Sequence, residues 1–181
     1  MNKGASKKMT TANKLTLLRV VLIPVFLVIL YLDFPGANWA ALAVFILASV
    51  TDMLDGYVAR HYDQTTNIGK FMDPLADKVL VLSAMCWFVS RGRMWAWLLA
   101  VVLLREFAVS GLRLVAVERG RVIAAAWSGK VKTAATMVCL CLMLAFSFGW
   151  LDVVCQLVIL VTTLYSGAEY LWKNRDVFRE N

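Results

Sequence analysis

The amino-acid sequence predicts an all-α, polytopic membrane protein with six transmembrane helices and a short N-terminal juxtamembrane segment. Three observations support this fold class. Hydrophobic residues make up 61% of the 181 residues and charged residues only 17%, with a mean hydropathy of +0.70, whereas an average soluble domain is about 45–50% apolar. The apolar residues form six long runs. The basic residues are distributed unevenly among the connections between these runs.

The six runs predict the helices in order, because a spanning helix needs about 20 mostly apolar residues. They cover residues 15–33, 38–60, 70–90, 94–117, 127–149 and 151–172. Turn-forming residues separate them at 33–38, 91–93 and 149–152. The first run is too long for a cleaved signal peptide and lacks a small-residue cleavage site, so we expect it to span the membrane.

The segments that flank the runs are basic. Residues 1–14 form a cytoplasmic lead-in that is either amphipathic or flexible, and residues 173–181 form a cytoplasmic tail. We expect residues 15–172 to be a single membrane domain, because no linker or repeat divides them.

The basic residues also predict an orientation. All Lys and Arg except Arg91 and Arg93 fall at or before residue 19, within 60–78, within 105–132 or after residue 171. By the positive-inside rule, both termini and the second and fourth connections face the cytoplasm, which agrees with an even number of spans. The net charge of +7 is therefore expected to favour binding to the lipid bilayer and not to nucleic acid.

Four aspartates form the candidate site. Asp52 and Asp55 lie three residues apart at the inner end of the second run, and Asp73 and Asp77 lie four apart at the start of the third. Each pair occupies one face of its helix. Because only the short stretch 61–69 joins the two helices, we expect all four carboxylates to share one volume. Clustered carboxylates at the membrane need compensating cations, and an all-oxygen ligand set favours Mg²⁺ or Mn²⁺, with two ions expected.

The stretch from residue 52 to 77 reads D-x-x-D-G-x-x-A-R-x8-G-x3-D-x3-D. It resembles the signature of the CDP-alcohol phosphotransferase family at every defining position. The resemblance implies that Asp52, Asp55 and Asp73 are mainly metal ligands, and that Asp77 is a ligand and the general base of catalysis. It also implies a homodimer in the bacterial cytoplasmic (inner) membrane. The residues implied to bind CDP-diacylglycerol are Asn13, Asp52, Gly56, Ala59, Arg60 and Gly69.

A cluster of basic residues indicates which kind of alcohol accepts the phosphatidyl group. Arg105, Arg113, Lys130 and Lys132 lie on or beside the fourth and fifth runs, near their inner ends. Positive-inside charge alone would explain most of them, but an acceptor that carries its own phosphate would need such cations, whereas choline or free inositol would not. This favours glycerol 3-phosphate. Arg105 lies about 12 Å of helix deeper than Arg113, so with Glu106 it would form a buried pair that is either functional or a structural tie.

The segments 13–19, 105–113 and 129–133 resemble the phosphatidylglycerophosphate synthase branch of this family, although the chain lacks that branch's usual Pro shortly before Asn13. The resemblance implies transfer of the phosphatidyl group from CDP-diacylglycerol to sn-glycerol 3-phosphate, giving phosphatidylglycerophosphate and CMP in phospholipid biosynthesis. Two alternatives within the family remain, a cardiolipin synthase and an enzyme that uses an inositol phosphate. A divalent-cation transporter is a remote alternative, since its site would be expected near the membrane midplane in repeated halves.

Overall fold

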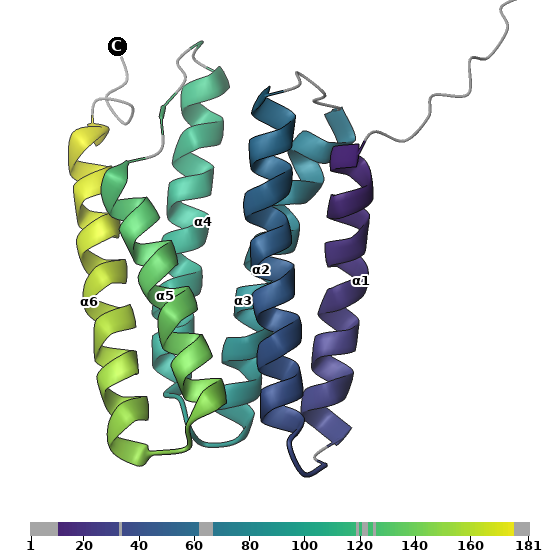
Figure 1. The fold of residues 1–181 in the computed structure, drawn as a ribbon. Coiled ribbons are helices and arrows are strands. Elements are labelled where there is room, and N and C mark those ends of the chain that lie inside the picture. The colour runs from purple at the N-terminus through teal and green to yellow at the C-terminus, as the bar shows by residue number, and fades with distance from the viewer. Residues whose placement is uncertain are drawn as a thin grey trace, which may run out of the picture. The chain divides into compact units, whose positions relative to one another are not determined.

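In a computed structural model, the described residues form six α-helices (Figure 1), so the predicted all-α class and the predicted order of helices are confirmed. The structure describes residues 11–32, 34–61, 67–118, 120, 123–124 and 126–175; side chains of residues 11–17, 19, 52–61 and 67–77 lie outside the description. The helices are α1 (Thr11–Leu32), α2 (Ala37–His61), α3 (Asn67–Ser90), α4 (Ala96–Glu118), α5 (Trp127–Ala145) and α6 (Gly149–Lys173). The chain forms two compact units, residues 1–84 and 85–181.

In the first unit, α1 and α2 pack side by side (Figure 1). The two helices meet at Phe26 of α1 and Phe45 of α2, whose ring centroids are 5.7 Å apart. Ala41 and Ala48 lie on the same face of α2 as Phe45, and all three are fully buried. Small residues one turn on either side of a large one let two helices approach closely. α1 begins at Thr11, so the last four residues of the predicted lead-in are helical.

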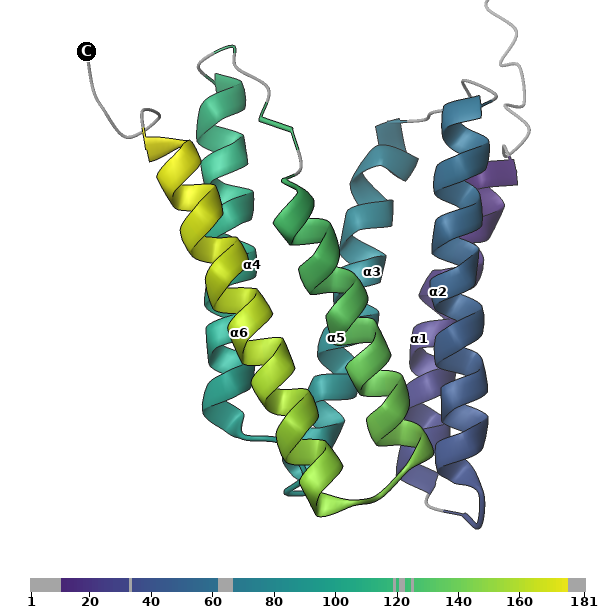
Figure 2. The same ribbon diagram turned by 60° about the vertical axis from the view of Figure 1, so that its left-hand side comes forward.

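In the second unit, α6 packs against both α4 and α5 (Figure 2). Its buried face is unusually polar, whereas its exposed face is apolar and includes Val153, Val161, Leu164 and Trp172. The polar residues of the buried face are Asp152, Gln156, Thr163, Ser166 and Tyr170. This inverted pattern is typical of a helix whose outer surface meets lipid, where polar groups must find partners inside the bundle.

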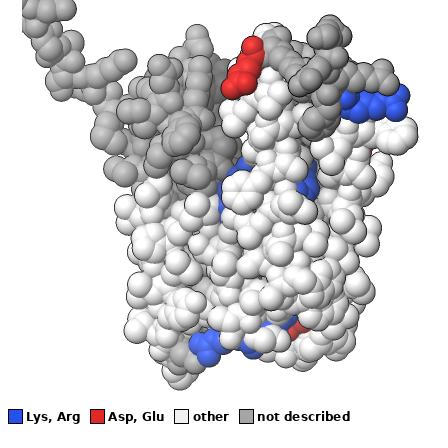
Figure 3. All heavy atoms as spheres, turned by 180° about the vertical axis from the view of Figure 1, so that it is seen from behind, with Lys and Arg blue, Asp and Glu red and all other residues white. Residues whose placement is uncertain are grey.

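The described surface agrees with a membrane environment. Among the described residues, α5 and α6 are long and apolar enough to cross a bilayer. On the face shown in Figure 3, the described surface is mostly uncharged; two small patches of basic atoms lie near its middle, and the other charged atoms lie near its two ends. An apolar surface of this extent would be unfavourable in water.

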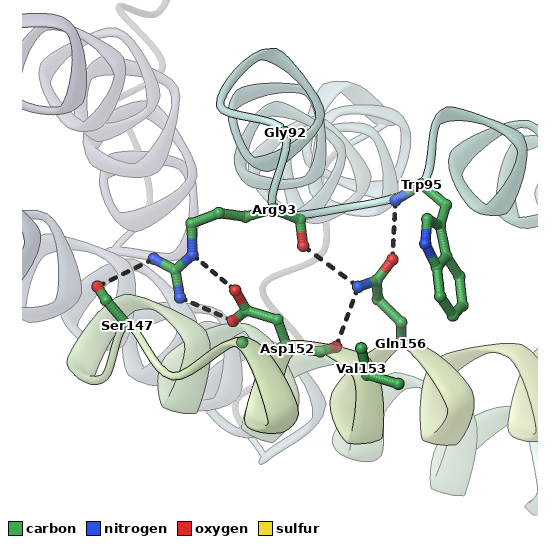
Figure 4. Close-up of a pocket in the computed structure, with 8 residues that line it drawn as sticks. Gly92, Arg93, Trp95, Ser147, Asp152, Val153 and Gln156 are labelled. Atoms are coloured by element: carbon green, nitrogen blue, oxygen red, sulfur yellow. Dashed lines mark hydrogen bonds and ion pairs between the residues drawn. The ribbon is translucent and has the colours of Figure 1, made fainter.

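A polar cluster joins the α3–α4 connection to the first turns of α6 (Figure 4). We call it the Arg93 clamp; its members are Arg93, Asp152 and Gln156. The Arg93 guanidinium donates from Nε and Nη2 to the two carboxylate oxygens of Asp152, at 2.8 and 2.7 Å. The Gln156 side chain accepts from the backbone N–H of Trp95 and donates to the carbonyl of Arg93. A pocket of about 400 Å³ lies beside the clamp, and the clamp residues that line it already form hydrogen bonds with one another.

The clamp also corrects the predicted end of the fifth helix. The sequence predicts a helix to residue 149 and a turn over 149–152, but α5 ends at Ala145 and residues 149–152 form the first turn of α6. Arg93 Nη2 donates to the carbonyls of Met143 and Phe146, at 2.9 and 2.7 Å. These carbonyls at the end of α5 thus find a partner outside the helix. Asp152 then lies in the first turn of α6, where a negative charge is favourable.

We predict that Arg93→Ala lowers the stability of the protein, because the substitution leaves the Asp152 carboxylate buried and without its cation. Breaking one side of a buried ion pair costs about 3 kcal/mol or more. The midpoint of thermal unfolding in detergent should fall clearly. Arg91→Ala, which changes an exposed arginine two residues away, is the matched control and should have a much smaller effect. Equal midpoints for the two variants would contradict this role of the clamp.

Candidate functional site

The predicted metal and nucleotide residues lie on the first three helices. Asp52 and Asp55 belong to α2 and Asp73 and Asp77 to α3. The other predicted nucleotide-binding residues are Asn13 in α1, Gly56, Ala59 and Arg60 in α2, and Gly69 in α3. All of these side chains lie outside the described residues, so their arrangement stays a prediction. Among the described side chains, no group of three or more His, Cys, Asp and Glu residues gathers to hold a metal ion.

The backbone supports two premises of the aspartate prediction. Both pairs lie within continuous helices, so spacings of three and four residues do place each pair on one helix face. α2 ends at His61 and α3 begins at Asn67, and helices with so short a connection are usually antiparallel neighbours. Four carboxylates in one volume would offer only hard oxygen ligands, a donor set that fits Mg²⁺ or Mn²⁺.

Two of the predicted acceptor-binding residues meet at one carboxylate. Oε1 of Glu106 accepts from Nη1 of Arg105 at 3.0 Å and from Nζ of Lys132 at 2.8 Å. Nη2 of Arg105 donates to the hydroxyl of Ser166. We call these four residues the Glu106 network. It joins α4, which carries Arg105 and Glu106, to α5 through Lys132 and to α6 through Ser166, and it confirms the expected Arg105–Glu106 pair.

The Glu106 network is largely buried and carries a net positive charge. The exposed fractions of the side chains are 13% for Arg105, 16% for Glu106 and 6% for Lys132. Ions withdrawn from water need close partners, because their mutual attraction must offset the lost hydration. Counted over these described residues, two cations and one anion give a formal charge of +1. A buried excess of positive charge attracts an anion and strengthens its binding relative to a site in water.

The side chain of Arg105 passes close to two glycines of the neighbouring helices. A Cβ atom at Gly167 of α6 would lie 3.2 Å from Cγ of Arg105, and a Cβ at Gly129 of α5 would lie 3.4 Å from its Nη2. Both positions therefore leave room for the arginine. Nε of Arg105 is buried and has no hydrogen-bond partner among the described residues, which leaves one donor of the guanidinium available.

Arg113 lies apart from the Glu106 network, near the end of α4. Its Nε donates to the hydroxyl of Tyr170 in α6 at 2.9 Å, and its guanidinium carbon lies 5.5 Å from the centre of the Tyr170 ring. Lys130, the fourth predicted residue, is exposed in the first turn of α5. The structure thus brings Arg105 and Lys132 together and does not bring Lys130 into their network.

The contribution of α6 to these contacts was not predicted from the sequence. Thr163, Ser166 and Tyr170 follow one another at spacings of three and four residues in α6. That spacing places them on one face. A polar stripe in a membrane helix is a signal for contacts inside the bundle, and it would have identified this face of α6.

Comparison with known proteins relates the chain to one enzyme family. A sequence model of the CDP-alcohol phosphatidyltransferase family matches residues 9–165. The CDP-diacylglycerol–glycerol-3-phosphate 3-phosphatidyltransferase of Bacillus subtilis is 39% identical, over 92% of this chain and 96% of the relative. The proteins of the same name from Salmonella typhimurium and Escherichia coli K12 are each 40% identical, over 87% of this chain and 90% of the relative.

We predict that Glu106→Gln destabilises the protein, because it leaves Arg105 and Lys132 buried without their shared anion. The expected loss is about 3–5 kcal/mol. The double substitution Glu106→Gln with Lys132→Met should recover part of this loss, since it removes one buried cation as well. Thermal unfolding of the single and double variants in detergent measures both effects. Glu118→Gln, on an exposed residue of the same helix, is the control; strictly additive effects would contradict the shared contact.

Proposed function

Because the chain belongs to the CDP-alcohol phosphatidyltransferase family, we propose that it transfers the phosphatidyl group of CDP-diacylglycerol to sn-glycerol 3-phosphate and releases CMP. The named relatives support this reaction, since each matches the chain over most of both lengths. The structural observation that carries the acceptor assignment is the buried pair of cations, Arg105 and Lys132. An alcohol with its own phosphate would match this pair, and an uncharged alcohol would not use it.

The reaction would take place at the four aspartates. Asp52, Asp55, Asp73 and Asp77 would hold two Mg²⁺ or Mn²⁺ ions. Metal ions at this site would supply neutralisation of the pyrophosphate charge of CDP-diacylglycerol. The Asp77 carboxylate would accept the proton of the attacking hydroxyl. The hydroxyl oxygen forms a bond to the phosphatidyl phosphorus as the bond from that phosphorus to the CMP oxygen breaks, so CMP leaves with the electron pair of that bond.

The nucleotide would be bound by residues around the aspartates. Gly56, Ala59 and Gly69 carry little or no side chain, which would let the cytidine nucleotide approach the helix backbones. Arg60 would contact phosphate oxygens through its planar guanidinium, and Asn13 of α1 would contact the nucleotide.

The acceptor phosphate would be bound by Arg105, Arg113 and Lys132, with Lys130 as an exposed cation at the start of α5. Arg105 and Lys132 already neutralise part of their charge with Glu106, so the phosphate would bind to the remaining positive charge. We further propose that the chain crosses the bacterial cytoplasmic membrane six times, with both termini and the site on the cytoplasmic side, and acts as a homodimer.

The first test measures CMP release by the detergent-purified protein given CDP-diacylglycerol, Mg²⁺ and glycerol 3-phosphate. We expect release only when all three are present, and none after addition of EDTA. Release with phosphatidylglycerol or an inositol phosphate in place of glycerol 3-phosphate would keep the family and change the acceptor. Folded protein that releases no CMP with any of these acceptors would contradict the proposal.

The second test separates the roles of two aspartates. Asp77→Asn should abolish turnover and leave binding of CDP-diacylglycerol largely intact, because an amide cannot accept the hydroxyl proton. Asp52→Asn should weaken metal dependence and nucleotide binding together. Turnover by both variants, and binding of a fluorescent CDP-diacylglycerol analogue over a Mg²⁺ titration, measure these effects. Full activity of Asp77→Asn would show that the general base is another group.

A further inference from the structure

We propose that α6 forms one wall of the acceptor site, with Ser166 and Tyr170 as positioning residues that orient the guanidinium groups of Arg105 and Arg113 towards an acceptor phosphate. The inference rests on the proposed function, because it assumes that these two arginines bind the phosphate. It adds residues of the last helix, which carries none of the sequence motifs that point to the site.

The Tyr170 hydroxyl binds the Nε edge of the Arg113 guanidinium. The Tyr170 side chain is 2% exposed and packs in a cluster with Val109, Leu112 and Ala116 of α4, so its hydroxyl has a fixed position. It accepts the Nε hydrogen of Arg113 at 2.9 Å. A guanidinium has five N–H donors, and use of Nε leaves the two terminal nitrogens as a fork. Such a fork is suited to paired hydrogen bonds with phosphate oxygens.

Ser166 holds Arg105 in a comparable way. Its hydroxyl is fully buried and accepts from Nη2 of Arg105. The adjacent Gly167 lets the aliphatic part of Arg105 lie against α6. The buried Nε of Arg105 has no partner among the described residues. Burial of a donor that can bond to nothing costs free energy, so this nitrogen indicates a place for a further acceptor atom such as a phosphate oxygen.

Ser166 and Tyr170 can orient the two arginines without neutralising their charge. Both contribute uncharged hydroxyl groups, so they fix the arginines and leave their positive charge in place. An aspartate or glutamate at either position would also fix an arginine, but it would cancel the charge that an anionic ligand needs. Among the described contacts, Glu106 performs that neutralising role for Arg105 and Lys132. The ligand class that matches two oriented arginines, of which only Arg105 is paired with a carboxylate, is a small phosphate monoester.

The test compares Tyr170→Phe with Tyr165→Phe. Tyr170→Phe keeps the buried ring and removes only the hydroxyl, whereas Tyr165 is 66% exposed on the same helix. Loss of one hydrogen bond to a charged group should raise KM for glycerol 3-phosphate about tenfold. KM for CDP-diacylglycerol should stay at the wild-type value, and the thermal midpoint of the free protein should fall only by the small amount that the loss of one hydrogen bond costs. Tyr165→Phe should match the wild type throughout, and Ser166→Ala should raise KM for glycerol 3-phosphate as Tyr170→Phe does.

Three results would overturn the positioning role. These are an unchanged KM for glycerol 3-phosphate in Tyr170→Phe, an equal rise in both KM values, or a fall in the thermal midpoint large enough to explain the rise in KM. If the wild type releases no CMP with glycerol 3-phosphate, the proposed function fails and the midpoint shift caused by inorganic phosphate decides the inference. A shift present in the wild type and absent in Tyr170→Phe would support it, and equal shifts would contradict it.

Discussion

The second unit depends on the pairing of charges that its helices carry away from water. Arg105 lies near the middle of α4, where a lone cation would be costly in a membrane, and Lys132 lies in the second turn of α5. One oxygen of Glu106 accepts hydrogen bonds from both. Helices α4 and α5 are thus connected by a contact that packing of apolar side chains alone would not provide.

The polar residues inside the second unit have two different roles. Glu106 and Asp152 neutralise cations, and they lie in distinct parts of the unit. Ser166, Tyr170 and Gln156 orient their partners through neutral groups. All except Glu106 belong to α6, whose outer surface is apolar. A helix with lipid on one side and hydrogen-bonding groups on the other can adjust the position of charged groups without carrying a large charge itself.

The sequence predicted much of the fold because membrane helices have a strong local signal. The six runs correspond to the six helices within a few residues at most ends, and the Arg105–Glu106 pair follows from two charges adjacent in an apolar run. The fifth helix was predicted too long, because Arg93, more than fifty residues before Phe146 in the chain, determines where its last carbonyls find a partner. Lys132, Ser166 and Tyr170 meet their partners only through helix rotation, which periodicity alone does not determine. The aspartate motif, by contrast, is local, and its side chains lie outside the described residues.

The direction of α4 and α6 has a mechanical consequence. The Arg93 clamp lies where both helices begin, and the Arg113–Tyr170 contact lies near where both end, so the two helices run parallel and are fastened at both ends. A lengthwise shift by one helical turn, about 5.4 Å, would break both fastenings. Helices α4 and α6 therefore form one rigid unit. Arg93 also donates to the carbonyls of Met143 and Phe146 at the end of α5, so one arginine fixes an end of all three helices, while Lys132 reaches Glu106 from α5 through a flexible four-carbon chain.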